Sequence, residues 1–339
     1  MSTGAVPGAL RYNELGRTGV TVSEIGFGAW AIALDWWGKK VEEDEAVRML
    51  RRAHDLGITL FETADMYGRG KSERLIGRAF EGRMDEVVVS TKFGYDFAGA
   101  EQIGHAELPQ RFDEEFARAA LRASLERLGA RKVGIYGLHN PKMPHVRDDG
   151  IFRTLDGIVG DGLADTYQAA LGPAIGWARE GLEAMERPGL GAVQTVYNVL
   201  EQTPGRELLE RAAERGVGVL ARVPDASGIL TGRVGADTKI DEKDHRSVRK
   251  GEWIRASLEK VEQLRPIAER NGLGIAELAV KFITGSRGIS SVLPTLTSVE
   301  EVEQYAAMSG CTDVPAGDMA EIRRIYDGWP AYELKGEAA

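Results

Sequence analysis

Residues 57–80, GITLFETADMYGRGKSERLIGRAF, pair a short apolar run with a segment of helical period. The run at 59–64 has the length and the β-branched and aromatic content of a buried strand, and 72–80 repeats apolar residues at helical spacing. The glycine-bearing turn between them carries an aspartate and a tyrosine, just after a glutamate. The stretch therefore predicts one strand, one loop and one helix of an α/β fold.

The same alternation recurs along the whole chain, after a hairpin expected at 12–22. The eight expected strands are residues 24–30, 59–64, 86–93, 133–139, 164–171, 192–199, 217–223 and 290–294. Expected helices are residues 44–56, 72–80, 113–128, 206–215 and 299–308. Gly57, Gly129 and Gly216 follow three of these helices and suit the left-handed conformation that ends a helix.

This repeated strand and helix pattern, with no linker or break in composition, predicts a single domain over residues 1–339. Eight units predict closure into a (β/α)8 TIM barrel, and a doubly wound open sheet is the alternative. Residues 226–253 break the alternation after the seventh strand. In a barrel they form an extended loop on the face where sites are built, although a solvated excursion explains them equally well.

Composition narrows the class of partner. The formal net charge is −9 with both signs mixed along the chain, so we expect no nucleic-acid partner. Cys311 is the only cysteine, which excludes an internal disulfide and argues against a cysteine-based metal site. No signal sequence or membrane-spanning run is evident, so we expect a cytoplasmic protein without a membrane partner. A small molecule is the expected ligand.

Polar side chains end three successive strands. Glu62 ends the second and precedes Tyr67, Lys92 ends the third, and His139 ends the fourth. Each alone has a structural explanation, as a salt bridge, a packed ring or a polar cap. Together they form a coherent acid-base set: the lysine favours the phenolate, the carboxylate holds the lysine charged, and the histidine orients a carbonyl oxygen.

The turn also resembles a phosphate-binding loop, because Gly70-Lys71-Ser72 ends the pattern G-x-x-x-x-G-K-[ST]. The first glycine of that pattern falls on Asp65, whose carboxylate would repel phosphate. The sequence therefore argues against a phosphate loop.

The residues resemble those of the aldo-keto reductase superfamily over nearly the whole chain. ETADMYG from Glu62 looks like the family's D-T-A-x-x-Y-G, STKFG carries its strand-end lysine, and LHNP from Leu138 looks like its L-H-x-P. Further similarities are LGRTGVTVSEIGFGAW near the start, Gln194 with VYN, and SGILTG from Ser227.

The resemblance implies a barrel that binds a nicotinamide cofactor and passes hydride to an aldehyde or ketone. Tyr67 would give the proton, tuned by Lys92 and by Glu62, with His139 beside them. Glu62 is one methylene longer than the family's aspartate, and a shift of about 1 Å in a catalytic constellation can cost on the order of a hundredfold in rate. By the same resemblance, Asp65 is a capping or loop residue.

The cofactor side departs from the family. Ala170-Leu171 stands where the family has Ser-Asn, Arg222 replaces a stacking aromatic residue, and Thr297 replaces a basic residue that meets the 2′-phosphate of NADPH. We expect NADP, with NAD open, and no metal. Arg222 and Arg233 are candidates for the pyrophosphate, or are solvated or paired with a loop carboxylate. The full set of candidate cofactor residues is Gln194, Arg222, Gly228, Leu230, Thr231, Gly232, Thr297 and Glu301.

Aromatic residues near the expected rim are candidates for a substrate wall, or pack beneath neighbouring loops. The expected substrate is a carbonyl compound or sugar. The candidates are Trp30, Trp36, Trp37 and Tyr95, with Phe97 and His105 on the third long connection. The C-terminal segment is expected to be helical over 317–326 and to bring Trp329 and Tyr332 near the pocket or under the barrel.

The leading hypothesis is an NAD(P)-dependent oxidoreductase that interconverts a carbonyl compound and an alcohol. A cofactor-binding regulatory subunit with little turnover is the second hypothesis, motivated by Glu62, Ala170-Leu171 and Thr297. A lyase or isomerase on the same barrel is the third. The substrate, the direction of reaction and the oligomeric state stay open.

Overall fold

A computed structural model describes residues 10–34, 39–99, 108–172, 177–241, 244–248 and 251–329. Among these residues, eight parallel strands lie in the order β10-β9-β8-β7-β6-β5-β4-β3. The two ends of this sheet meet: the Gly26 amide donates to the Val292 carbonyl and the Val292 amide donates to the Glu24 carbonyl, both at 2.8 Å. The sheet is therefore a barrel, as predicted, and the alternative of an open doubly wound sheet is wrong.

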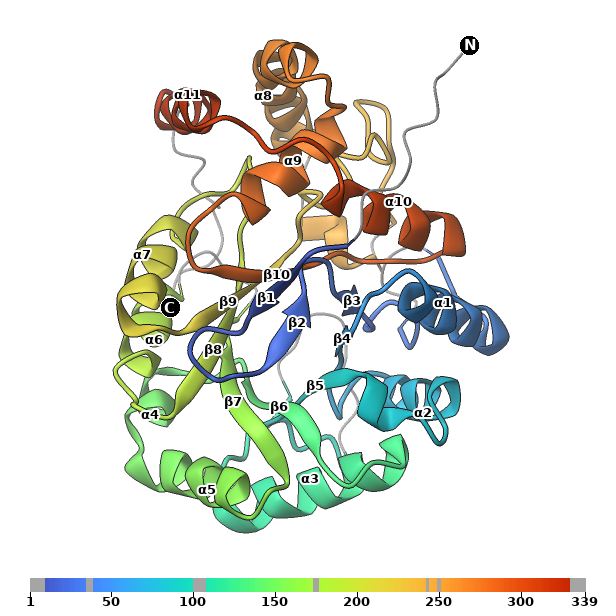
Figure 1. Cartoon of the computed structure of the whole chain (residues 1–339), viewed down its shortest axis with the longest axis vertical. Helices are drawn as coiled ribbons and strands as arrows, with labels where there is room; N and C mark the ends of the chain where they lie inside the picture. The colour runs from blue at the N-terminus through green and yellow to red at the C-terminus, as the bar shows by residue number, and fades with distance from the viewer. Residues whose placement is uncertain are drawn as a thin grey trace.

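The helices surround the strands (Figure 1). The hairpin is β1 (Tyr12–Glu14) and β2 (Thr21–Ser23), and the barrel strands are β3 (Phe27–Gly28), β4 (Leu60–Glu62), β5 (Val88–Phe93), β6 (Val133–His139), β7 (Ala164–Ala170), β8 (Leu190–Val196), β9 (Gly218–Arg222) and β10 (Ile289–Leu293). The α-helices are α1 (Glu43–Asp55), α2 (Lys71–Ala79), α3 (Glu114–Leu128), α4 (Met143–Arg147), α5 (Asp149–Gly160), α6 (Ala178–Ala184), α7 (Gly205–Arg215), α8 (Gly251–Arg270), α9 (Ile275–Thr284), α10 (Val299–Ser309) and α11 (Ala316–Asp327). Two short 3₁₀ turns are η1 (Met84–Glu86) and η2 (His245–Val248).

The strands agree with the sequence pattern, and β6 has the predicted bounds. The largest difference is β3, which has two residues where seven were expected. The expected glycines have positive φ angles of 94° at Gly57, 63° at Gly129 and 70° at Gly216. A Cβ at Gly216 would lie 2.4 Å from the Arg17 side chain, which would have to move. The positive φ angle is therefore the stronger reason for glycine at this position.

The barrel interior is filled by a small apolar cluster to which β4, β6, β8, β9 and β10 each contribute one residue. Leu60, Ile135 and Leu220 belong to it, and Leu15 and Val22 of the hairpin close one end. Because side chains alternate along a strand, residues two positions beyond these point into the barrel as well. Glu62 and Arg222 are two such residues. The alternation of side chains along β4 and β9 therefore places these polar groups at the carboxyl-terminal end of the barrel interior.

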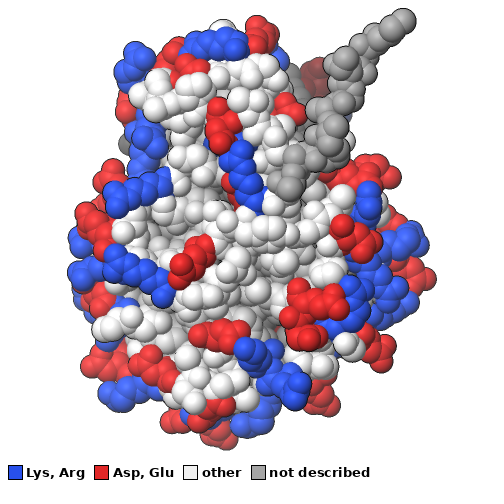
Figure 2. Space-filling view, in the orientation of Figure 1, with Lys and Arg blue, Asp and Glu red and all other residues white. Residues whose placement is uncertain are grey.

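Charged residues of both signs are interspersed around the edge of the face shown in Figure 2. That distribution matches the mixed charge pattern in the sequence. Among the described residues, no helix has the length and apolarity needed to cross a membrane.

Candidate active site

Glu62, Lys92 and His139 lie together at the carboxyl-terminal end of the barrel strands, which we call the mouth of the barrel. Glu62, Lys92 and His139 have exposed fractions of 3%, 1% and 7%, and they lie on the adjacent strands β4, β5 and β6. The Lys92 ammonium forms an ion pair with Glu62 and donates to the Thr63 carbonyl at 2.6 Å. The charged pair predicted from the sequence is therefore formed, even though the carboxylate is one methylene longer than in the family pattern.

Tyr67 completes this cluster from the loop after β4. The Lys92 Nζ lies 5.0 Å from the centroid of its ring, and the His139 ring meets it edge-on at a centroid distance of 5.7 Å. The phenol, ammonium and imidazole are thus brought together although they lie up to 72 positions apart in the chain (139 − 67).

The electrostatics differ from the expectation in one respect. The pKa of Tyr67 is raised well above its ordinary value, first by burial and second by the charge of Glu62. The expected lowering of the Tyr67 pKa is therefore wrong. The pKa of His139 lies well below its ordinary value, chiefly because of burial. Near neutral pH the site presents a protonated phenol and an uncharged imidazole, which are both hydrogen-bond donors.

Tyr95, which the sequence offered as a substrate residue, and Gln110, which the sequence did not indicate, both contact the end of β6. The Tyr95 ring meets the His139 ring edge-on at 5.1 Å, and its hydroxyl accepts a hydrogen bond of 2.8 Å from the Asn140 amide. The Gln110 amide donates to the carbonyls of His139 and Asn140 at 3.1 and 3.0 Å. These contacts fix the end of β6, and no spacing rule in the sequence signals them.

Asp65 is more than the loop residue that was expected. It lies in the turn, but its exposed fraction is 2%, and its Oδ1 has no partner among the described residues. Burial and the nearby Glu73 charge raise its pKa well above the ordinary value. Glu73 itself accepts from Thr91 and Arg127, both at 2.6 Å.

The residues that resembled a phosphate loop have other partners. The Ser72 hydroxyl accepts from Thr63 at 2.8 Å and donates to the Ala29 carbonyl at 2.9 Å, and Lys71 lies 3.5 Å from Glu43. Gly70 has φ 79°, and the Arg127 side chain would lie 2.3 Å from a Cβ placed there. The glycine therefore makes room for an arginine, which agrees with the rejection of a phosphate site.

Gln194 and Arg222, the candidate cofactor residues nearest the cluster, enter the mouth from β8 and β9. The Gln194 amide donates to Glu62 at 3.2 Å, and its Oε1 is buried without a partner among the described residues. Arg222 donates through Nη2 to the carbonyls of Leu171 and Gly172, at 2.7 Å each. Within the described part of the chain it pairs with no carboxylate within 4.0 Å, so the expected alternative of a loop salt bridge is not found there.

The turn that follows β9 holds Gly228, Leu230, Thr231 and Gly232. It is strained, because Val223, Ala226 and Ser227 have φ angles of 57°, 47° and 61°, which non-glycine residues rarely adopt. Gly228 itself has φ 96°. The cofactor role of this turn stays a prediction.

Thr297 and Glu301, the last candidate pair, lie at the start of α10. Glu301 accepts from the Thr297 amide at 2.7 Å and from its hydroxyl at 3.1 Å. Arg233 is held between Glu301 at 2.8 Å and the buried Asp225 at 3.2 Å. The solvated alternative for Arg233 is thus wrong, and Asp225 is a partner that the sequence did not indicate.

The aromatic candidates are only partly placed. Trp30 donates to the Thr295 hydroxyl at 3.1 Å near the barrel seam. The Phe97 ring lies 6.0 Å from the Arg69 guanidinium. Trp329 packs against α8, where it donates to Gln263 at 3.0 Å, rather than against the phenol. Trp36, Trp37, His105 and Tyr332 lie outside the described residues.

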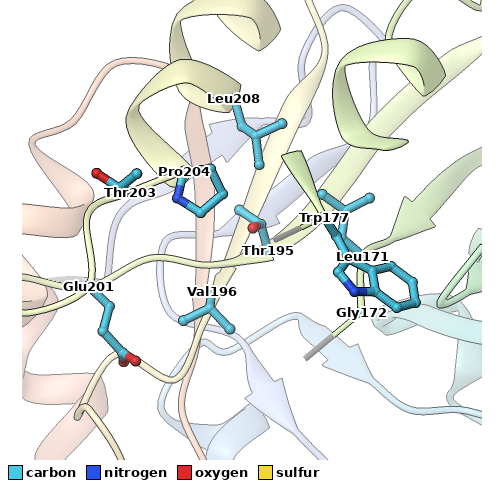
Figure 3. A pocket seen from close by; sticks show the side chains of 9 residues that line it. All are labelled: Leu171, Gly172, Trp177, Thr195, Val196, Glu201, Thr203, Pro204 and Leu208. Atoms are coloured by element: carbon cyan, nitrogen blue, oxygen red, sulfur yellow. The ribbon is translucent and has the colours of Figure 1, made fainter. Parts of the chain in front are cut away.

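A small cavity lies beyond the ends of β7 and β8 (Figure 3). Its volume is about 10 Å³, room for about one water molecule, so it is too small for a substrate. Its lining includes Leu171 and Gly172, whose carbonyls accept from Arg222. The described residues contain no group of three His, Cys, Asp or Glu side chains that could hold a metal ion.

Comparison with known proteins decides the family. Residues 24–327 match the model of the Aldo/keto reductase family. The chain belongs to this family. The aldo-keto reductase YhdN of Bacillus subtilis (strain 168) is 27% identical over 334 residues, which cover 94% of each chain. A probable voltage-gated potassium channel subunit beta of Oryza sativa subsp. japonica is 26% identical, over 86% of this chain and 89% of that protein.

Solved structures of aldo-keto reductases share the fold. The glycerol dehydrogenase AKR11B4 from Gluconobacter oxydans has a TM-score of 0.80 and 21% identity, over 97% of this chain and 99% of that one. The holo form of aldo-keto reductase AKR11C1 from Bacillus halodurans has a TM-score of 0.77 and 20% identity, over 96% and 99%. Membership in the aldo/keto reductase family implies an oxidoreductase that acts on small carbonyl compounds with a nicotinamide cofactor.

Proposed function

We propose that this protein reduces an aldehyde or ketone to an alcohol, with Tyr67 as the proton donor. The observation that carries the proposal is the cluster in which the partly exposed, protonated phenol of Tyr67 lies against the buried side chains of Lys92 and His139. A phenol that keeps its proton is suited to donate it to a carbonyl oxygen as negative charge develops there.

Each side chain has a distinct part in this scheme. When bound, the nicotinamide cofactor supplies the hydride that adds to the carbonyl carbon. The Tyr67 hydroxyl gives its proton to the carbonyl oxygen, and the uncharged His139 donates a hydrogen bond that orients the same oxygen. The Lys92 ammonium, held by Glu62, stabilises the phenolate that remains. Proton transfer through such a group contributes about 10²- to 10⁴-fold in rate.

The residues of the mouth fit a nicotinamide cofactor. Gln194 offers a buried oxygen without a partner, and the strained turn after β9 is a candidate for the rest of the molecule. The residues around Thr297 fit both NADP and NAD. The Glu301 carboxylate, which can accept from a ribose hydroxyl, is paired with Arg233, and the Lys39 ammonium donates to the Thr297 carbonyl at 3.0 Å, so charges of both signs lie at this end of the site.

The test is oxidation of NADH and NADPH with a panel of aldehydes, ketones and sugars, with Tyr67→Phe as the paired variant. We expect turnover with wild type and a loss of about 10²- to 10⁴-fold in kcat for Tyr67→Phe, with cofactor binding unchanged. Absence of turnover with both cofactors across the panel contradicts the proposal. Equal rates in the variant contradict the role of Tyr67.

A second candidate function is a regulatory subunit that binds the cofactor with little turnover. The likeness to probable potassium channel β subunits favours it, at 26% and 24% identity. Under this alternative, wild type binds NADH by fluorescence quenching without turnover, and Glu62→Asp does not restore activity. Robust turnover that Tyr67→Phe abolishes excludes it.

A further inference from the structure

A largely buried ion pair lies between the barrel and the outer helices α2 and α3 (Figure 1). Glu73, in the first turn of α2, is fully buried, and its carboxylate accepts from the Arg127 Nε of α3 at 2.6 Å. The same carboxylate accepts from the Thr91 hydroxyl of β5 at 2.6 Å. We call Glu73 and Arg127 the outer ion pair. The proposed chemistry uses neither of its charges.

The turn over residues 65–70, which carries Tyr67, has a backbone that needs support from its surroundings. Three successive residues, Gly68, Arg69 and Gly70, have φ angles of 58°, 52° and 79°. Arg69 is not a glycine, and a residue with a side chain keeps such an angle only where neighbouring contacts hold it there. The contacts at the two ends of the turn therefore fix where the Tyr67 ring lies.

The end of this turn lies against the outer ion pair. The Ser72 amide donates to the Tyr67 carbonyl at 3.2 Å, and Ser72 is next to Glu73 in the chain. A Cβ at Gly70 would lie 2.3 Å from Cδ of Arg127, so the arginine side chain lies directly against the last residue of the turn.

The start of the turn is tied to the strand that Glu73 also contacts. The Asp65 amide donates to the Lys92 carbonyl at 3.1 Å, and Lys92 follows Thr91 on β5. The outer ion pair therefore connects the turn that carries the phenol with the strand that carries the ammonium. These are the two groups whose separation, 5.0 Å from Nζ to the ring centroid, the proposed proton transfer depends on.

We infer that the outer ion pair is a positioning element for the reaction: Arg127, through Glu73, holds the Tyr67 phenol against Lys92. The inference rests on the proposed reduction and adds two residues outside the barrel that act through the turn. A displacement of about 1 Å in a catalytic site can cost on the order of a hundredfold in rate, so loss of this support should lower kcat. Binding of the cofactor does not involve the turn and should stay unchanged.

The experiment measures kcat and the cofactor dissociation constant in Arg127→Met, with the most active aldehyde of the panel and the preferred cofactor. We expect kcat to fall about 10- to 100-fold and the dissociation constant to change less than about 3-fold. Arg127→Lys should recover part of the loss. Arg118→Met is the matched control, because Arg118 lies on the same helix and pairs with exposed carboxylates, and it should change neither quantity.

Two variants guard against a trivial result. Glu73→Gln added to Arg127→Met leaves no unpaired buried charge, so it replaces the single variant if that variant does not fold, and we expect the same loss of kcat. In a Tyr67→Phe background, Arg127→Met should lower kcat less than about 2-fold, because the two residues act as one unit. An equal loss in both backgrounds, or a parallel loss of cofactor binding, overturns the inference.

A measurement without turnover separates the inference from the proposed function. In protein labelled with 3-fluorotyrosine, the ¹⁹F resonance of Tyr67 is assigned by its absence from Tyr67→Phe. We expect Arg127→Met to shift or broaden this resonance and Arg118→Met to leave it unchanged. If wild type turns over no aldehyde but the resonance responds in this way, the positioning stands and the reductase proposal fails. A Tyr67 resonance that is the same in wild type and Arg127→Met overturns the inference.

Discussion

Replacing Glu62 by glutamine isolates the buried ion pair at the base of the site. The variant keeps the size of the side chain and removes its charge, so Lys92 loses the counter-ion beside its ammonium. Lys92 is 1% exposed, and burial already lowers its pKa while Glu62 raises it. Removing one partner of a buried pair costs about 3–5 kcal/mol of unfolding free energy.

The loss should depend on pH, because Lys92 can release its proton. Deprotonating Lys92 at pH 7 costs about 4.6 kcal/mol, because the pKa of a lysine in the unfolded chain is about 10.4. The variant can always escape the unpaired charge by this route, so the loss of unfolding free energy stays within the range of about 3–5 kcal/mol. In Glu62→Gln the pKa of Lys92 in the folded protein falls further below its pKa in the unfolded chain. At pH values between these two pKa values the unfolded chain binds more protons than the folded protein, so the free energy of unfolding rises with pH by up to about 1.4 kcal/mol per pH unit.

The assay is guanidinium chloride unfolding of wild type and Glu62→Gln at pH 7 and pH 9. We expect a loss of about 3–5 kcal/mol at pH 7 that shrinks by up to about 2.7 kcal/mol at pH 9. Glu62→Asp, which keeps the charge, should lose less. Glu114→Gln breaks an exposed pair with Arg118 and should change stability by under about 0.5 kcal/mol. A loss below 1 kcal/mol, or one that is identical at both pH values, refutes the reasoning.

Three further predictions concern other parts of the site. The active His139 imidazole is uncharged and its pKa is well below the ordinary value, so kcat/KM should stay constant from pH 8 to about 6.5 and fall only at lower pH. His139→Gln should remove this fall at low pH, and a fall centred above pH 7 in wild type contradicts the assignment. Thr297→Arg combined with Glu301→Gln should shift the ratio of dissociation constants toward NADPH by about tenfold or more, measured by fluorescence quenching, and an unchanged ratio places the 2′ end elsewhere. Gly70→Ala should lower the free energy of unfolding by more than Gly82→Ala. Both glycines have positive φ angles, but only a Cβ at Gly70 would meet a neighbour, the Arg127 side chain. Equal losses in thermal or denaturant unfolding rule out a contribution from this contact.

Much of the fold was predictable, because hydrophobic period and glycine caps are local properties. The β6 strand and the positive φ angles at Gly129 and Gly216 follow from neighbouring residues alone. The short β3 was not predictable, because this segment meets β10 and the residues after it through isolated bridges at Ile25 and Gly28 rather than through a regular ladder. Which residues form a ladder there depends on β10, far away in the chain.

The sequence predicted which strand-end residues lie together, but it did not predict their pKa shifts or all of their charge pairs. Strand ends identified Glu62, Lys92 and His139 as neighbours, since parallel strands of a barrel end on one rim. The direction of the Tyr67 pKa was wrong, because the degree of burial depends on the whole barrel. The burial of Asp65 and the pairing of Arg233 with Asp225 and Glu301 were likewise missed, because no local pattern encodes which distant charges will meet.

The sequence by itself determined the repeated strand and helix units, the residue types at the strand ends and the family resemblance, because each is written in local order and spacing. The tertiary structure decided how charge is shared among those residues. Closure of the barrel removes water from the mouth, pairs Lys92 with Glu62, and leaves Arg222 without a carboxylate among the described residues. Desolvation and the distances between charges are properties of the closed barrel, so they follow only from the three-dimensional arrangement.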